Sequence, residues 1–286
     1  MKIVDIGSGA PIVVIPGIQG RWEWMKPGID AVAQRSRVIT FSLCDEPTSG
    51  GHFDERAGFW CYVDQVREAL DASGIDRAAI CGVSYGGLIA AAFAARHPER
   101  VSSLVLVSAL PPAWEPDARV SFYTRFPWLL TPLFCFGSLR LYREIAAAKE
   151  GWCSGVTTAV SHGINVLRHM FHPGRMARRV HLLNSVRIEA DLARVQVPTL
   201  VVTGEDSLER VVPPRVTRRY LELWPHARAA TIGRTGHLGL ITRPAEFATV
   251  VSTFAADHAP RAIDAARPDP GSPIPDPFVM SRRRIG

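Results

Sequence analysis

The sequence lacks any apolar run long enough to cross a membrane. Such a span needs about 20 predominantly apolar residues, whereas the longest candidate, residues 127–139, is shorter and is interrupted by Pro132 and Gly137. Residues 1–7 also lack the basic-then-apolar pattern of a signal peptide. We therefore expect no integral membrane segment, and the cytoplasm is the simplest location.

Cysteine is scarce and irregularly spaced. The chain has five cysteines among 286 residues, and an odd number without a repeated spacing argues against a disulfide framework and against a zinc site. Cys81, which lies inside an apolar run, is predicted to be a small packing residue. We therefore expect a reducing compartment and no bound metal.

One long stretch has no acidic residue. Residues 151–188 contain no Asp or Glu but several arginines and histidines, and a second basic cluster, residues 282–284, lies near the C-terminus. The whole chain carries a formal net charge of +6. No nucleic-acid-binding module accompanies these charges, so we interpret them as a solvated basic face. Attraction to an anionic substrate or to a membrane surface stays open as the alternative.

The remaining composition is that of an ordinary globular protein with a sizeable core. Hydrophobic residues make up 47% of the chain and charged residues 21%, which suits one large domain with an insertion, or at most two domains. Short apolar runs alternate with segments of helical periodicity, which predicts an α/β fold with a mostly parallel sheet flanked by helices. The predicted strands are residues 2–6, 12–15, 38–43, 78–80, 101–108, 199–203 and 229–232. The predicted helices are residues 22–33, 54–72, 88–96, 214–223 and 244–256.

The alternation of strands and helices stops in the middle of the chain. Residues 112–196 are predicted to be helical and are richer in aromatic and basic residues, which indicates a helical cap inserted over the sheet. The core domain is then residues 1–111 and 197–257. Residues 258–286 are rich in proline and predict a disordered tail.

A serine lies in a glycine-rich turn between a predicted strand and a predicted helix. Residues 82–86 are Gly-Val-Ser-Tyr-Gly, the Gly-x-Ser-x-Gly pattern of a nucleophile elbow. In that turn Ser84 takes a strained backbone conformation that projects its Oγ above the sheet, and Gly82 and Gly86 lie where a Cβ would collide. We predict Ser84 as a nucleophile, with an ordinary glycine-rich turn as the alternative.

A histidine late in the chain is the second group that such a site requires. A serine hydroxyl needs a base to take its proton, and the base needs an acid to orient it. In elbow-type enzymes the order along the chain is serine, acid, histidine. His237 follows the last predicted strand, and the preceding Gly236 lets its loop turn toward the serine. We predict His237 as the base rather than as an isolated surface residue.

With these residues in place, the chain resembles the α/β-hydrolase superfamily over about residues 2–257. Members commonly show a glycine, two residues, an aspartate, and then an apolar pair and a proline. This chain departs from that pattern, because counting forward from Gly204 reaches Ser207, which cannot act as the acid. Counting back from the Val-Val-Pro of residues 211–213 reaches Glu209.

Because the loop departs from the usual pattern, more than one residue is a candidate for the acid of the predicted triad. We predict Glu209, whose additional methylene suits a loop lengthened by two residues, and Asp206 is the second candidate. Glu115 or no acid at all is the further alternative, and Glu205 is interpreted as a solvated loop charge. A buried carboxylate beside the histidine would fix its tautomer and stabilise the imidazolium formed during attack.

The resemblance also implies two main-chain donors for an oxyanion. One is the N–H after the nucleophile, here Tyr85, and the other lies in the loop after an early strand, here residues 16–20. The Ile18 N–H matches the second donor, with an ordinary strand-ending turn as the alternative. Pro16 replaces the histidine usual at this place, which leaves a main-chain donor intact. Gln19 is predicted to reach the substrate.

Apolar residues of the predicted cap are candidates for the wall of a substrate pocket. Trp128 and Phe134 are predicted to bind substrate, although the same side chains could equally form a plain cap core. The full candidate set is Phe122, Trp128, Leu129, Leu130, Phe134 and Phe136.

The resemblance implies a serine hydrolase that cleaves a small or medium carboxylic ester through an acyl-enzyme, with neither a metal nor an organic cofactor. Lactones, thioesters, amides, carbon–carbon bonds and cofactor-free haloperoxidase chemistry are open alternatives on this fold. A ligand-binding protein with slow or no turnover, and a protein that docks on membranes through its basic cap, are the alternatives from other classes. We expect a small-molecule substrate and no nucleic acid, and either a monomer or a homodimer.

Overall fold

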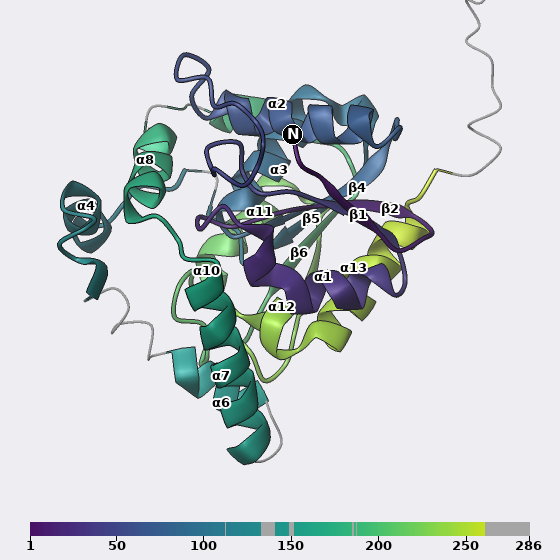
Figure 1. The fold of residues 1–286 in the computed structure, drawn as a ribbon. Coiled ribbons are helices and arrows are strands. Elements are labelled where there is room, and N and C mark those ends of the chain that lie inside the picture. The colour runs from purple at the N-terminus through teal and green to yellow at the C-terminus, as the bar shows by residue number, and fades with distance from the viewer. Residues whose placement is uncertain (112, 133–140, 149–151, 185, 187, 261–286) are drawn as a thin grey trace, which may run out of the picture.

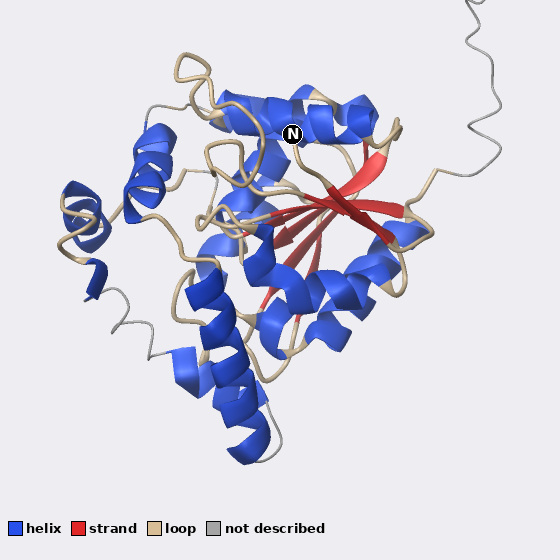
Figure 2. Ribbon diagram, viewed as in Figure 1, coloured by secondary structure: helices blue, strands red, loops and turns tan. Residues whose placement is uncertain are grey.

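The computed structural model describes residues 1–111, 113–132, 141–148, 152–184, 186 and 188–260. In this part of the chain, seven strands form one sheet in the order β1-β3-β2-β4-β5-β6-β7, with helices on both faces (Figure 1 and Figure 2). Strand β1 pairs antiparallel with β3, and every other neighbouring pair is parallel. The strands are β1 (Val4–Ile6), β2 (Pro11–Ile15), β3 (Arg37–Thr40), β4 (Ala78–Val83), β5 (Val101–Val107), β6 (Thr199–Thr203) and β7 (Arg228–Thr231). The predicted α/β fold class is confirmed.

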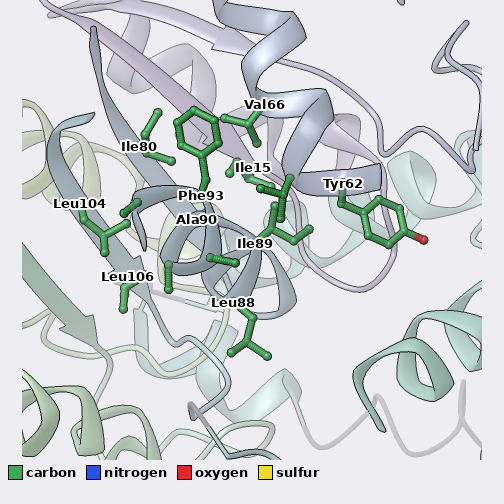
Figure 3. Close-up of a cluster of buried hydrophobic side chains, with 14 of the residues drawn as sticks. Ile15, Tyr62, Val66, Ile80, Leu88, Ile89, Ala90, Phe93, Leu104 and Leu106 are labelled. Atoms are coloured by element: carbon green, nitrogen blue, oxygen red, sulfur yellow. The ribbon is translucent and has the colours of Figure 1, made fainter. Parts of the chain in front are cut away.

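The two faces of the sheet carry separate cores because side chains alternate along each strand. In β2, Val13 and Ile15 contribute to one cluster of buried side chains, whereas Ile12 and Val14 contribute to the other. Helices α2 (Trp60–Ala72) and α3 (Tyr85–Arg96) cover the first face, where Figure 3 shows part of the packed cluster. Helices α1 (Lys26–Ala33) and α13 (Pro244–Asp257) cover the second. Burial on both faces explains why the central strands are apolar throughout.

The remaining described elements include five helices between β5 and β6, where the sequence predicts the cap. Figure 1 shows α4, α6, α7 and α8 beside the sheet rather than within its layers. These five are α4 (Ala118–Arg125), α6 (Tyr142–Ala148), α7 (Trp152–Arg168), α8 (Pro173–Asn184) and α9 (Glu189–Leu192). The others are η1 (Trp22–Met25), η2 (Pro98–Arg100), α10 (Pro214–Thr217), α11 (Arg219–Leu223) and α12 (Gly239–Thr242).

Several predicted boundaries differ from the observed ones. The helix predicted over residues 54–72 begins only at Trp60, because Gly58 has a φ of +57°, outside the helical range, and the Asp54 side chain accepts a hydrogen bond from the Arg56 N–H. The helix predicted over residues 22–33 is divided into η1 and α1. The predicted tail lies outside the described residues from residue 261 onward. No helix in the described part of the chain is long and apolar enough to span a membrane.

Candidate active site

Ser84 occupies a strained turn between β4 and α3. Its φ is +54° and its ψ is −115°, a conformation that costs a non-glycine residue about 1–3 kcal/mol. A Cβ at Gly82 would collide with the backbone of Gly86, and a Cβ at Gly86 would lie 2.6 Å from the carbonyl oxygens of Ile15 and Pro16. The turn can close only with glycine at these two places, as the elbow pattern predicts.

The backbone of Ser84 is fixed to the neighbouring strand. Its N–H donates to the Val107 carbonyl at 2.9 Å, and its carbonyl accepts from the Gly87 N–H at 2.9 Å. The side chain therefore lies at the carboxyl end of β4, which is the edge where parallel α/β sheets bind ligands. Ser84 is buried, with 8% of its surface exposed.

The loop of residues 16–20 passes directly beside this serine. A Cβ built on Gly17 would lie 3.5 Å from the Ser84 Cβ and 3.3 Å from the Gln19 Oε1. The Gly20 N–H donates to the Gly17 carbonyl at 2.9 Å and closes a tight turn around Ile18. The structure thus brings the segment that carries the predicted donor, Ile18, and the predicted substrate contact, Gln19, to the elbow.

His237 follows β7 and Glu209 follows β6, so both lie at the same carboxyl edge of the sheet as Ser84, close to each other. The distance from His237 Nδ1 to Glu209 Oε2 is 3.4 Å, and the side chains are 14% and 0% exposed. Among the described residues, Nδ1 makes no hydrogen bond of good geometry, so the pair is close but not fully aligned. Hydrogen bonds of this kind are often long in unliganded enzymes and shorten when substrate binds.

The Glu209 carboxylate is held on both oxygens. Oε1 accepts from the N–H groups of Val211 and Val212 at 2.7 and 3.0 Å, and Oε2 accepts from the Ser108 hydroxyl at 3.4 Å. Burial opposes ionisation of this carboxyl, but the interaction with His237 and the two N–H donors outweigh it and hold the pKa of Glu209 below its usual value. The acid is therefore ionised and oriented toward the imidazole.

Two loops come into van der Waals contact to make this pairing possible. A Cβ at Gly236 would lie 2.7 Å from the backbone N of Glu209, so only glycine fits before the histidine. The Glu205 N–H donates to the Thr235 carbonyl at 2.8 Å, and the Glu205 Oε1 accepts from the Arg234 N–H at 2.7 Å. Glu205, interpreted from the sequence as a solvated charge, joins the acid loop to the histidine loop.

The other candidate acids lie elsewhere. Asp206 is 62% exposed and pairs with Arg218 at 3.2 Å, and Glu115 is exposed on the segment before α4. The structure brings Glu209, rather than either of these residues, to His237.

Of the two predicted substrate contacts of the cap, the structure describes Trp128, which is exposed. Trp128 is 63% exposed, and its ring packs edge-on against His172 with 4.8 Å between centroids. Phe134 lies outside the described residues. A role for Trp128 in substrate binding stays a prediction.

One residue that the sequence did not indicate supports the histidine loop. The buried Glu144 of α6 accepts hydrogen bonds on Oε1 from the Thr235 hydroxyl at 2.9 Å and from the Leu238 N–H at 2.5 Å, one on each side of His237. Burial raises the pKa of Glu144. No sequence signal pointed to it, because α6 lies in the predicted cap, far from the histidine loop along the chain. In the described part of the chain, no three His, Cys, Asp or Glu side chains are grouped as a metal site.

Comparisons with known proteins agree with this fold. The family model described as "alpha/beta hydrolase fold" matches residues 10–132. The chain is 29% identical over 255 residues to "Putative carbamate hydrolase RutD" of Pseudomonas savastanoi pv. phaseolicola, covering 86% of this chain and 94% of that protein. It is 27% identical over 271 residues to a 2-hydroxymuconate semialdehyde hydrolase of a Pseudomonas species, covering 91% of each.

Solved structures show the same fold. A bromoperoxidase from Bacillus anthracis superposes with a TM-score of 0.71 at 18% identity, covering 88% of this chain and 94% of that one. The enol-lactonase from Burkholderia xenovorans LB400 superposes with a TM-score of 0.67 at 18% identity, covering 88% and 95%. The family model over residues 10–132 and the relatives support the α/β-hydrolase superfamily, and the solved structures show its fold. The relatives named above are hydrolases, which supports a hydrolase of this family.

Proposed function

We propose that this protein is a serine hydrolase that cleaves a small or medium carboxylic ester through an acyl-enzyme. Ser84 is the nucleophile, His237 is the general base, and Glu209 is the acid that orients it. The observation that carries this proposal is the pairing of His237 with the buried carboxylate of Glu209, 3.4 Å apart, at the same edge of the sheet as the strained serine turn.

In the first half of the reaction, His237 takes the proton of the Ser84 hydroxyl as Oγ attacks the carbonyl carbon of the ester. The negative charge that forms on the carbonyl oxygen is stabilised by the N–H groups of Ile18 and Tyr85, each worth about 3–4 kcal/mol of barrier. The alkoxide leaving group takes the proton from His237, and the acyl group stays on Ser84.

In the second half, His237 removes a proton from water, and the hydroxide attacks the acyl carbon. The second oxyanion uses the same two donors, and its collapse releases the carboxylic acid and returns the proton to Ser84. Glu209 stays ionised throughout and stabilises the imidazolium.

The relatives support one alternative substrate in particular. RutD is named for carbamate hydrolysis, and a carbamate, like an ester, presents a carbonyl carbon to a serine nucleophile. We therefore keep a carbamate as the second candidate. We place the activity in the cytoplasm and assign a small-molecule substrate.

A labelling and turnover experiment tests the proposal. A serine-directed fluorophosphonate is expected to label the wild type and not Ser84→Ala, and p-nitrophenyl esters of increasing acyl length are expected to be hydrolysed by the wild type alone. An aryl carbamate assayed in parallel decides between the two substrate classes. A wild type that is neither labelled nor active on any of these compounds would favour a ligand-binding protein.

A further inference from the structure

The guanidinium of Arg179, on α8 of the cap, is completely buried beside the candidate active site. Its Nη1 donates to the Ile18 carbonyl at 2.6 Å, and its Nη2 donates to Asp45 Oδ1 at 2.5 Å and to Glu46 Oε1 at 2.6 Å. The side chains of Arg179, Asp45 and Glu46 are 0%, 0% and 1% exposed. A charged group is buried to this degree only when its partners are well placed, since desolvation costs several kcal/mol per ion.

This arginine contacts both residues whose N–H groups are the proposed oxyanion donors. Besides the bond to Ile18, the Arg179 carbonyl accepts from the Tyr85 hydroxyl at 3.4 Å. A Cβ at Gly20, whose φ is +73°, would overlap the guanidinium, so the end of the loop is shaped to fit it. The Gly20 carbonyl in turn accepts from the Leu43 N–H at 2.8 Å. The loop of residues 16–20 is therefore held between the cap and the segment after β3.

We infer that Arg179 is a positioning residue for the oxyanion hole, an inference that rests on the proposed function. The carbonyl and the N–H of Ile18 belong to two peptide planes that share one Cα, so fixing the carbonyl restricts the direction of the N–H. Charge-assisted bonds of about 2.6 Å are the strong kind. Arg179 is buried away from solvent and acts through Ile18 rather than on the substrate.

The variants separate positioning from charge neutralisation. Arg179→Met removes the bond to Ile18 but also leaves Asp45 buried without this partner, and leaves Glu46 with its longer contact to Arg175, at 3.5 Å. A triple variant that adds Asp45→Asn and Glu46→Gln removes the buried carboxylate charges, so that the loss of Arg179 does not prevent the chain from folding. The matched control is Arg178→Met, which removes the same charge from the adjacent exposed side chain, paired with Glu55 at 3.2 Å.

The kinetic readout compares an ester with its thionoester, in which sulfur replaces the carbonyl oxygen. Sulfur accepts hydrogen bonds poorly, so a thionoester gains little from the oxyanion donors. We expect both Arg179 variants to lose about 100-fold in kcat on the ester, the size of a 1 Å misplacement. KM and thionoester turnover are expected to change by less than about 3-fold, and Arg178→Met is expected to match the wild type. Equal losses on ester and thionoester, or recovery of ester kcat in the triple variant, would overturn the inference.

Hydrogen exchange provides a readout that does not depend on turnover. The amides of residues 17–20 are expected to exchange at least 10-fold faster in the triple Arg179 variant than in Arg178→Met. If the wild type hydrolyses no ester, the proposed function fails, and exchange alone then decides: faster exchange supports the positioning by Arg179, whereas unchanged exchange overturns it.

Discussion

The imidazole of His237 meets the carboxylate of Glu209 with 3.4 Å between Nδ1 and Oε2, although the glutamate stands two residues beyond the place where the superfamily pattern puts an aspartate. The longer side chain is compatible with the lengthened loop, and Oε1 is fixed by the Val211 and Val212 N–H groups. The proposed triad acid is therefore displaced along its loop, and a longer side chain accompanies the longer loop.

Replacing the acid is expected to reduce catalysis far more than replacing its neighbour. Glu209→Gln keeps the shape but removes the charge that stabilises the imidazolium, so kcat should fall on the order of 10³–10⁴-fold. Asp206→Asn, the matched control, should stay within about 2-fold of the wild type because Asp206 pairs with Arg218 at the surface. Steady-state kinetics on the best ester checks both variants, and the reverse ranking would show that Asp206 is the acid.

The stability of the protein should depend on pH through Glu209. Its pKa in the folded state lies below the ordinary value of 4.5, so its ionised form stabilises the fold. That contribution is complete above about pH 4.5 and is lost as the pH falls through the lower, folded-state pKa. Urea unfolding of the wild type and Glu209→Gln between pH 3 and 7 measures it. The stability difference in favour of the wild type should shrink on acidification, and a constant difference would contradict the prediction.

Glu144 should show the opposite dependence. Burial raises its pKa above 4.5 in the folded state, so the protonated form is the one favoured by folding. Its contribution is complete below about pH 4.5 and is lost as the pH rises through the raised pKa. The unfolding free energy of the wild type relative to Glu144→Gln should therefore fall between pH 4 and 8. A difference that grows with pH would show that the carboxylate is stabilised where it lies.

The elbow should not tolerate a single added methyl group. Gly86→Ala places a Cβ 2.6 Å from the carbonyl oxygens of Ile15 and Pro16, so it should destabilise the fold by about 1–3 kcal/mol and abolish labelling of Ser84. Gly163→Ala is the control, because a Cβ there, on α7, meets nothing within 4 Å. It should raise stability by up to about 1 kcal/mol. Thermal melts and fluorophosphonate labelling measure both, and equal effects would refute the crowding argument.

Two cysteines should be able to form a disulfide under oxidising conditions. The Sγ atoms of Cys44 and Cys61 are 3.4 Å apart, and the hydrogen bond between the thiols lowers the pKa of Cys61 to about 7. A thiolate at neutral pH attacks an oxidant readily. Treatment with diamide should join the peptides that carry these two residues, while the buried Cys81 stays reduced. Mass spectrometry after digestion identifies the joined peptides. Oxidation of Cys81 rather than of Cys61 would contradict the prediction.

The parts of the fold and site that could be predicted from sequence are local. The central strands are continuous apolar runs because both of their faces are buried, and the elbow is recognisable because its glycines are required within five consecutive residues. The start of α2 was misplaced because Gly58 interrupts an otherwise helical pattern. Trp128 is a predicted pocket residue because of its residue type and its place in the predicted cap, and neither of these reveals that it is 63% exposed.

The sequence by itself determined the sheet, the strained serine and the late histidine, because each follows from short-range periodicity or from the steric needs of one turn. Only the tertiary structure decided that Glu209 faces His237, that Glu144 holds the loop around that histidine, and that Arg179 binds the Ile18 carbonyl. Each of these contacts joins segments distant along the chain, and the pairing of a buried charge depends on which distant backbone and side-chain groups surround it.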